Sequence, residues 1–146
     1  MKTTIQFNGN NVEIRLTKEQ VAEIKRNMHD YRAIETVEDA FSFLGVDYEK
    51  WLETRAGLES HELAYSKLTM VTKAVNGGEW MDYGNSNVYK HYPFFNSSGS
   101  GSGFSFNDFS CVRSISYVGS RLCLSSEEKA KYVGNQFLAL YNQLIN

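Results

Sequence analysis

The residues best suited to binding a ligand are aromatic rings and arginines in the middle of the chain. Trp80, Tyr89 and Tyr92 offer flat faces on which a base or another ring can stack. Arg113 and Arg121 can make forked contacts with a phosphate or carboxylate group. Aromatic residues in strands also serve as core and cross-strand pairs, and an isolated arginine commonly finds a surface carboxylate. The cluster therefore predicts either a site for an anionic, ring-containing ligand or ordinary packing.

A glycine- and serine-rich run, residues 96–103, lies beside these residues. Backbone N–H groups at Gly101 and Gly103 could point into a concavity that suits a phosphate, and Lys90 could add positive charge. A phosphate-binding loop normally leads directly into a helix, whereas here Phe104 and further aromatic residues follow. The run is thus interpreted either as an anion-binding loop or as a solvent-exposed connector.

Groups able to carry catalysis are few. The acids and bases in the aromatic region are Glu79, Asp82, His91 and Asp108, and nothing in their spacing requires them to meet. No zinc-protease, nucleophile-elbow or P-loop motif occurs in the sequence. We therefore expect a protein that is not an enzyme. An enzyme that turns over a nucleotide is the third hypothesis, after ligand binding and protein binding.

The two cysteines, Cys111 and Cys123, are interpreted as small buried side chains on strands. A zinc site that also used His91 would lack a fourth ligand, so we expect neither a metal nor a cofactor. Two cysteines are too few for a disulfide-stapled scaffold, which favours a reducing, cytoplasmic setting.

Composition excludes several classes of protein. The chain has 146 residues, of which 42% are hydrophobic and 22% charged, and its net charge is −2. This is not the basic signature of a protein that holds nucleic acid through phosphates. No apolar run is long enough to cross a bilayer, and the N-terminus lacks the apolar stretch of a secretory signal.

Hydrophobic periodicity and capping signals predict an α+β fold. Residues 1–146 are expected to form a single domain, with a main body over 36–146 and a hairpin plus helix over 1–32 that could serve as an attachment or oligomerisation element. The whole chain is expected to consist of an N-terminal β-hairpin, about three helices, a small antiparallel sheet over about 80–124 and a C-terminal helix packed on that sheet. The expected helices are 18–30, 36–44, a turn within 46–58, 60–76 and 125–144, and the expected strands are 3–7, 11–16, 88–95, 112–117 and 120–124.

The middle and C-terminal thirds resemble a group of small accessory proteins carried by tailed phages and prophages of gut anaerobes. The resemblance rests on the order of aromatic and glycine residues over about 36–144. It includes Trp80-Met-Asp-Tyr, Asn87-Val-Tyr-Lys-His-Tyr-Pro-Phe-Phe and Gly119-Ser-Arg-Leu-Cys. The group carries no assigned activity, and small phage accessory proteins often counter host defence.

This resemblance implies a binding protein in the cytoplasm of a host cell that sequesters a nucleotide-derived immune signal. The expected ligand contacts are Trp80, Tyr89, Lys90, Tyr92, Gly101, Gly103, Arg113 and Arg121. The alternative is a protein-binding inhibitor of a host defence protein, or a virion or replication accessory, which would use the same tyrosine-rich surface. Open sheet edges and exposed aromatic residues lead us to expect a homo-oligomer.

Overall fold

A computed structural model describes residues 2–7, 10–17, 20, 30–97, 103–115 and 120–144. The chain begins with an antiparallel hairpin of β1 (Lys2–Phe7) and β2 (Asn10–Arg15), as the alternating sequence predicts. Thr17 and Gln20 then exchange the two hydrogen bonds of a capping box, at 3.0 and 3.2 Å. Most of the helix expected over 18–30 lies outside the described residues.

The next elements are the 3₁₀ turn η1 (Tyr31–Ala33) and the helices α2 (Val37–Leu44) and α3 (Tyr48–Glu53). The backbone N–H of Asp39 donates to the Thr36 hydroxyl at 3.0 Å, and the Asp39 carboxylate accepts from the Thr36 backbone at 2.9 Å. Gly45 ends α2 with a positive φ of 66°, a conformation that favours glycine. The start and end signals in the sequence therefore placed α2 correctly.

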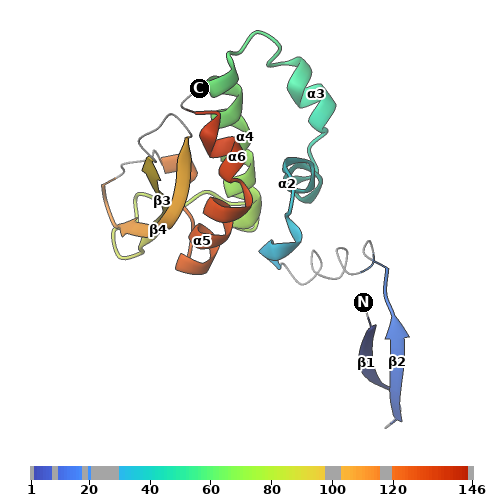
Figure 1. The fold of residues 1–146 in the computed structure, drawn as a ribbon. Helices are drawn as coiled ribbons and strands as arrows, with labels where there is room; N and C mark the ends of the chain where they lie inside the picture. Colours follow the sequence, from blue (N-terminus) through green and yellow to red (C-terminus); the bar gives the residue numbers. More distant parts are fainter. Residues whose placement is uncertain are drawn as a thin grey trace.

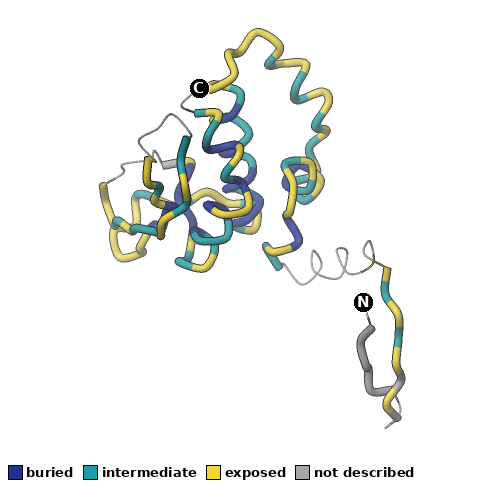
Figure 2. The backbone as a smooth tube through the Cα atoms, in the orientation of Figure 1, coloured by how far each residue is buried: buried dark blue, intermediate teal, exposed yellow. Residues whose placement is uncertain are grey.

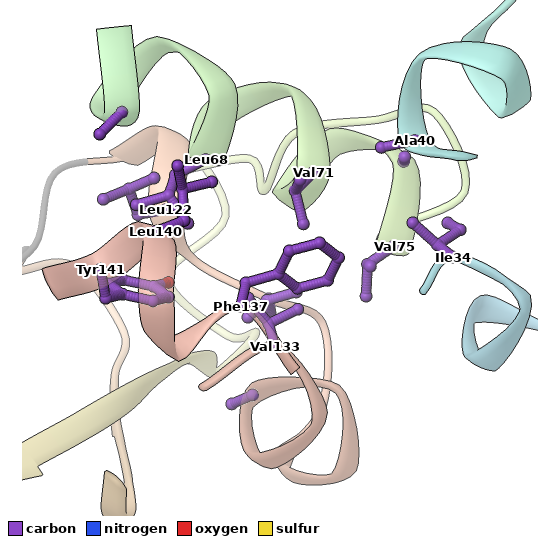
Figure 3. Packing of buried hydrophobic residues seen from close by; sticks show 14 residues of the cluster. Ile34, Ala40, Leu68, Val71, Val75, Leu122, Val133, Phe137, Leu140 and Tyr141 are labelled. Carbon is purple, nitrogen blue, oxygen red and sulfur yellow. The ribbon is translucent and has the colours of Figure 1, made fainter. Parts of the chain in front are cut away.

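The long helix α4 (Ser60–Val75) lies at the centre of the body, with α2 and α3 on one side and the β3–β4 sheet beyond α6 on the other (Figure 1). Leu68, Val71 and Val75 of α4 are buried and pack against apolar residues of α5 and α6 (Figure 3). Burial of such side chains stabilises the fold by about 1.5–3 kcal/mol each. The connection between α3 and α4 is exposed (Figure 2).

The sheet of the main body consists of β3 (Lys90–Ser97) and β4 (Phe104–Val112), which pair antiparallel. Backbone hydrogen bonds between His91 and Leu124, at 2.9 and 2.7 Å, add a short bridge along β3. The strand expected over 120–124 is largely the 3₁₀ turn η2 (Ser120–Leu122), and the expected strand 112–117 begins where β4 ends. Residues 116–117 lie outside the described part of the chain.

The C-terminal helix is divided into α5 (Glu127–Gln136) and α6 (Leu138–Asn142). Phe137 forms the junction, with φ −109° and ψ 24°, and its side chain is buried in the core. The spacing of apolar residues predicts one continuous helix, because a single residue that departs from helical φ and ψ values does not change that spacing. Helix α5 packs directly on β3 and β4, so the expected α+β architecture, with C-terminal helix on sheet, is confirmed.

Candidate functional site

Two cationic side chains, one exposed and one half-buried, meet at the exposed indole ring of Trp80. The guanidinium carbon of Arg121 lies 3.9 Å from the centre of the Trp80 ring, and Lys73 Nζ lies 4.5 Å from it. Both distances are typical of cation–π contacts. We call Lys73, Trp80 and Arg121 the Trp80 cluster; the sequence had singled out Trp80 and Arg121, and the structure places them in contact.

The local fold explains why these three residues meet. Lys73 occupies the last turn of α4, where the helix dipole favours a cation. Gly77 and Gly78 follow with φ values of 80° and 98°, and these left-handed residues end the helix before Trp80. In the sequence, Lys73 is marked only by its place one turn before this glycine pair, and it is not among the predicted contacts.

The side chain of Asn76 holds the segment after Arg121 against the end of α4. Asn76 Nδ2 donates to the carbonyl oxygen of Cys123 at 2.9 Å, and the backbone N–H of Ser125 donates to Asn76 Oδ1 at 3.0 Å. Leu122, which directly follows Arg121, is buried in the core. Arg121 therefore projects from an anchored segment toward the ring of Trp80.

The Trp80 ring and the Arg121 guanidinium are open to a ligand, and Lys73 is half-buried beside them. Trp80 is 37% exposed and Arg121 is also exposed. Within the described ranges, no carboxylate forms an ion pair with Lys73 or Arg121. A guanidinium stacked on a ring keeps its N–H donors at its edge, where they can bind phosphate or carboxylate in forked geometry. The cluster can therefore hold an anion beside an aromatic ring.

Tyr89 and Arg113 form a separate pair at one end of the sheet. The pairing of Lys90 with Val112 in the β3–β4 register brings their chain neighbours Tyr89 and Arg113 side by side. Arg113 Nη2 donates to the Tyr89 hydroxyl at 2.8 Å, and its guanidinium carbon lies 4.4 Å from the ring centre. Among the described residues, no hydrogen bond, ion pair or ring contact joins this pair to the Trp80 cluster. The two predicted arginines, Arg113 and Arg121, therefore belong to two separate groups of side chains and not to one site.

Lys90 lies inside the protein and has no exposed surface. Its ammonium group donates to the backbone carbonyl of Asn85 and lies 5.2 Å from the centre of the Tyr83 ring. The Tyr83 hydroxyl is in turn 3.0 Å from Cys123 Sγ. Lys90 is therefore placed to hold the 83–89 loop rather than to meet a ligand at the surface, a role that its position beside Tyr89 in the sequence does not reveal.

The remaining predicted contacts are Tyr92 and the two glycines. Tyr92 is buried in the interior, so its ring faces are covered. Gly101 lies outside the described residues. Gly103 has a φ of 87°, and a Cβ there would meet the Asn142 side chain at 2.5 Å, so glycine is needed at this position. The structure does not bring Tyr92 or Gly103 into the Trp80 cluster.

The acid and base candidates are also dispersed. Asp82 accepts a hydrogen bond from the backbone of Gly84 at 2.7 Å, and Asp108 lies 3.7 Å from Lys131 Nζ. The His91 ring contacts the rings of Tyr89 and Phe109, and burial lowers its pKa. Among the residues described, no hydrogen bond joins any two of Glu79, Asp82, His91 and Asp108.

The cysteines occupy different environments. Cys123 is buried as expected, and burial raises the pKa of its thiol. Cys111 is exposed, so the expectation that it is buried is wrong; in β4 its side chain lies on the outer side, with more covered residues on either side of it. No group of three or more potential metal ligands occurs among the described residues.

Three hollows are lined by described residues, and none of the predicted contacts is among their lining residues. One is an apolar cavity of about 330 Å³ between α4, α6 and the β3–β4 sheet. The other two are more open, one beside η1 and α5 and the other beside the start of α2 and α6. None of the three is lined by Trp80, Tyr89, Arg113 or Arg121.

Comparison with protein-family models, with curated proteins and with solved structures finds no match for this chain. None of the helices formed by described residues has the length and apolar character needed to cross a bilayer.

Proposed function

We propose that this protein is a non-catalytic binding protein that sequesters an anionic, nucleotide-type small molecule at the Trp80 cluster. The observation that carries the proposal is the meeting of two cations on one exposed indole. Arg121 and Lys73 lie 3.9 and 4.5 Å from the centre of the Trp80 ring, and neither is neutralised by a described carboxylate.

The chemistry of the cluster favours a phosphate or pyrophosphate group over a neutral ligand. Two cations held beside the same ring repel each other, and an anion placed between them relieves that repulsion. Arg121 offers a planar fork of donors, and Lys73 adds a point charge at the end of α4. The exposed part of the Trp80 side chain offers apolar contact to the ribose or base of the same molecule.

Sequestration, rather than turnover, is the activity that this arrangement supports best. The acid and base candidates are dispersed over several elements and form no hydrogen-bonded pair among the described residues, whereas the cluster has charge and ring contact suited to holding a ligand. Together with the resemblance to phage accessory proteins, this leads us to propose capture of a nucleotide-derived immune signal in a host cell. Cyclic nucleotides and ADP-ribose-type molecules are the ligand classes to test.

Isothermal titration calorimetry with a panel of cyclic nucleotides and ADP-ribose derivatives tests the proposal. We expect one member to bind and to raise the thermal midpoint, since ligand at 100 times Kd stabilises a fold by about 2.7 kcal/mol. Arg121→Gln should weaken this binding roughly 10- to 150-fold, because a charge-assisted contact contributes about 1.5–3 kcal/mol. Lys73→Gln should weaken it in the same direction.

Arg55→Gln is the matched control. Arg55 lies over the ring of Trp51 at 4.0 Å, nearly the same geometry as Arg121 over Trp80, but no second cation contacts that ring among the described residues. This variant should bind the ligand as the wild type does. If no nucleotide of the panel binds, or if Arg121→Gln binds as tightly as Arg55→Gln, the proposal is wrong.

A second function, inhibition of a host protein by direct binding, is favoured by a different observation. Large apolar side chains are exposed where β3 begins and β4 ends: Tyr89 is 46% exposed and Ile115 is 60% exposed, with Val88 beside them. Exposed apolar groups of this kind mark protein interfaces. Affinity capture from host lysate with wild type and with Ile115→Asp tests it; a stoichiometric partner that is lost only in the variant supports this alternative.

A further inference from the structure

The apolar cavity between α4, α6 and the β3–β4 sheet has the features of a small-molecule site. It has a volume of about 330 Å³, within the range of cavities that hold small ligands. Five separate elements or element ends supply its walls. Three rings and two leucines of its lining are Phe95, Phe104, Tyr141, Leu122 and Leu144.

Three of the rings, those of Phe95, Phe104 and Tyr141, contact one another. The ring centres of Phe95 and Phe104 are 5.4 Å apart with an interplanar angle of 27°, which is a stacked arrangement. The ring centre of Tyr141 lies 4.6 Å from that of Phe95, and Tyr141 is itself buried. Such contacts between aromatic rings stabilise the arrangement beyond the burial of their area. Three rings of the wall are therefore held in place by contacts with one another.

Among the polar groups at the wall, the backbone N–H and carbonyl of Phe104 are hydrogen-bonded, whereas the buried hydroxyl of Tyr141 has no hydrogen-bond partner among the described residues. The backbone N–H of Phe104 donates to Asn142 Oδ1, and Asn142 Nδ2 donates to the carbonyl oxygen of Phe104 at 3.4 Å. A nucleobase would lose hydrogen bonds with water on entering such a cavity and would find few partners to replace them. An apolar ring has no hydrogen bonds with water to lose, and it gains contact with the surrounding rings.

We propose that this cavity binds a flat, fused two-ring apolar molecule, of the size of naphthalene. An apolar cavity of about 150 Å³ accommodates benzene, and the volume here is about twice as large. Flatness is favoured because the walls are rings, which prefer stacked or edge-on contact with another ring. The site is distinct from the Trp80 cluster, none of whose members lines the cavity.

The test uses 2-naphthol as the probe and decahydro-2-naphthol as its saturated counterpart. Calorimetric titration of the full chain should give a Kd between about 10 μM and 1 mM for 2-naphthol, the range expected for a ligand of this size. The saturated compound should bind at least about fivefold more weakly, because it cannot stack. Methyl NMR signals of Leu122 and Leu144 should shift on addition of 2-naphthol.

Leu144→Trp is the blocking variant, and Leu58→Trp is its matched control. Leu144 lines the cavity and is half-buried, so a larger ring there fills the space, whereas Leu58 is exposed in the connection between α3 and α4. We expect Leu144→Trp to weaken binding at least about tenfold and Leu58→Trp to leave it unchanged. Sedimentation velocity of each variant reports whether a second copy occupies the cavity instead.

Absence of 2-naphthol binding to the wild type would overturn the proposal, as would equal binding to the two tryptophan variants. Equal affinity for the flat and saturated compounds would overturn the preference for a flat ring. If the wild type does not bind 2-naphthol and Leu144→Trp no longer oligomerises, then the cavity is a contact between two copies of the chain and the proposal is wrong. Because Arg121→Gln leaves the cavity intact, naphthol binding and nucleotide binding succeed or fail independently.

Discussion

The close approach of α5 to the sheet at Gly134 gives the sharpest stability prediction. Gly134 is buried, and a Cβ added there would lie 2.6 Å from two ring carbons of Phe106 and 2.7 Å from Pro93 Cβ. Atoms at such distances must move apart, and the rigid proline ring leaves little freedom for that. The substitution Gly134→Ala should therefore force α5 away from β3 and β4.

The magnitude follows from two opposing terms. Overpacking of this kind costs about 2–3 kcal/mol, whereas alanine in place of glycine within a helix contributes about 1 kcal/mol of stability. The net loss should be about 1–2 kcal/mol. For a chain of this length, that corresponds to a thermal midpoint lower by roughly 2–8 °C.

Urea unfolding followed by circular dichroism measures this change, with Gly57→Ala as the matched control. A Cβ at Gly57 would meet nothing within 4 Å, so the control carries the same loss of unfolded-chain entropy without the clash. Gly57→Ala should stay within about 0.5 kcal/mol of the wild type. If Gly134→Ala is as stable as Gly57→Ala, then α5 does not lie against the sheet as described.

Three further predictions concern local features. Thr36→Ala removes the hydroxyl that caps α2 and accepts from the Asp39 backbone, and chemical denaturation should show a loss of about 1 kcal/mol. Iodoacetamide should label exposed Cys111 rapidly in the native protein and spare Cys123, whose thiol is buried with a raised pKa; mass spectrometry that finds Cys123 labelled first would contradict this. Burial lowers the pKa of His91, so the folded state favours the neutral ring and this contribution to stability is lost as pH falls below about 6.5. The thermal midpoint of His91→Gln should therefore fall less between pH 7.5 and pH 5 than that of the wild type.

The helices were predictable wherever local signals agreed. The capping box of Thr36 and the left-handed Gly45 fixed both ends of α2, and the glycine pair after residue 76 fixed the end of α4. The division between α5 and α6 was not predictable, because Phe137 has the apolar character that a continuous helix also requires. Its departure from helical geometry depends on how its side chain packs in the core, which the local sequence does not encode.

The candidate site was predictable in its residue types and only partly in its geometry. Trp80 and Arg121 are 41 positions apart in the sequence, and their contact depends on the long-range hydrogen bonds that Asn76 makes with the Cys123–Ser125 segment. Lys90 carries the charge of a ligand contact but is directed inward, toward the Asn85 carbonyl. Residue type indicates what a side chain can do, whereas its direction is set by strand register and by contacts distant in sequence.

Native mass spectrometry of the purified protein tests ligand capture most directly. Wild type, Arg121→Gln and Arg55→Gln would each be produced in cells that make candidate nucleotide signals, and the material released on denaturation would be identified. We expect a phosphate-containing molecule at near one equivalent per chain in the wild type and Arg55→Gln, and little or none in Arg121→Gln. Retention of the same molecule by all three proteins, or by none of them, would contradict a role for the Trp80 cluster in binding.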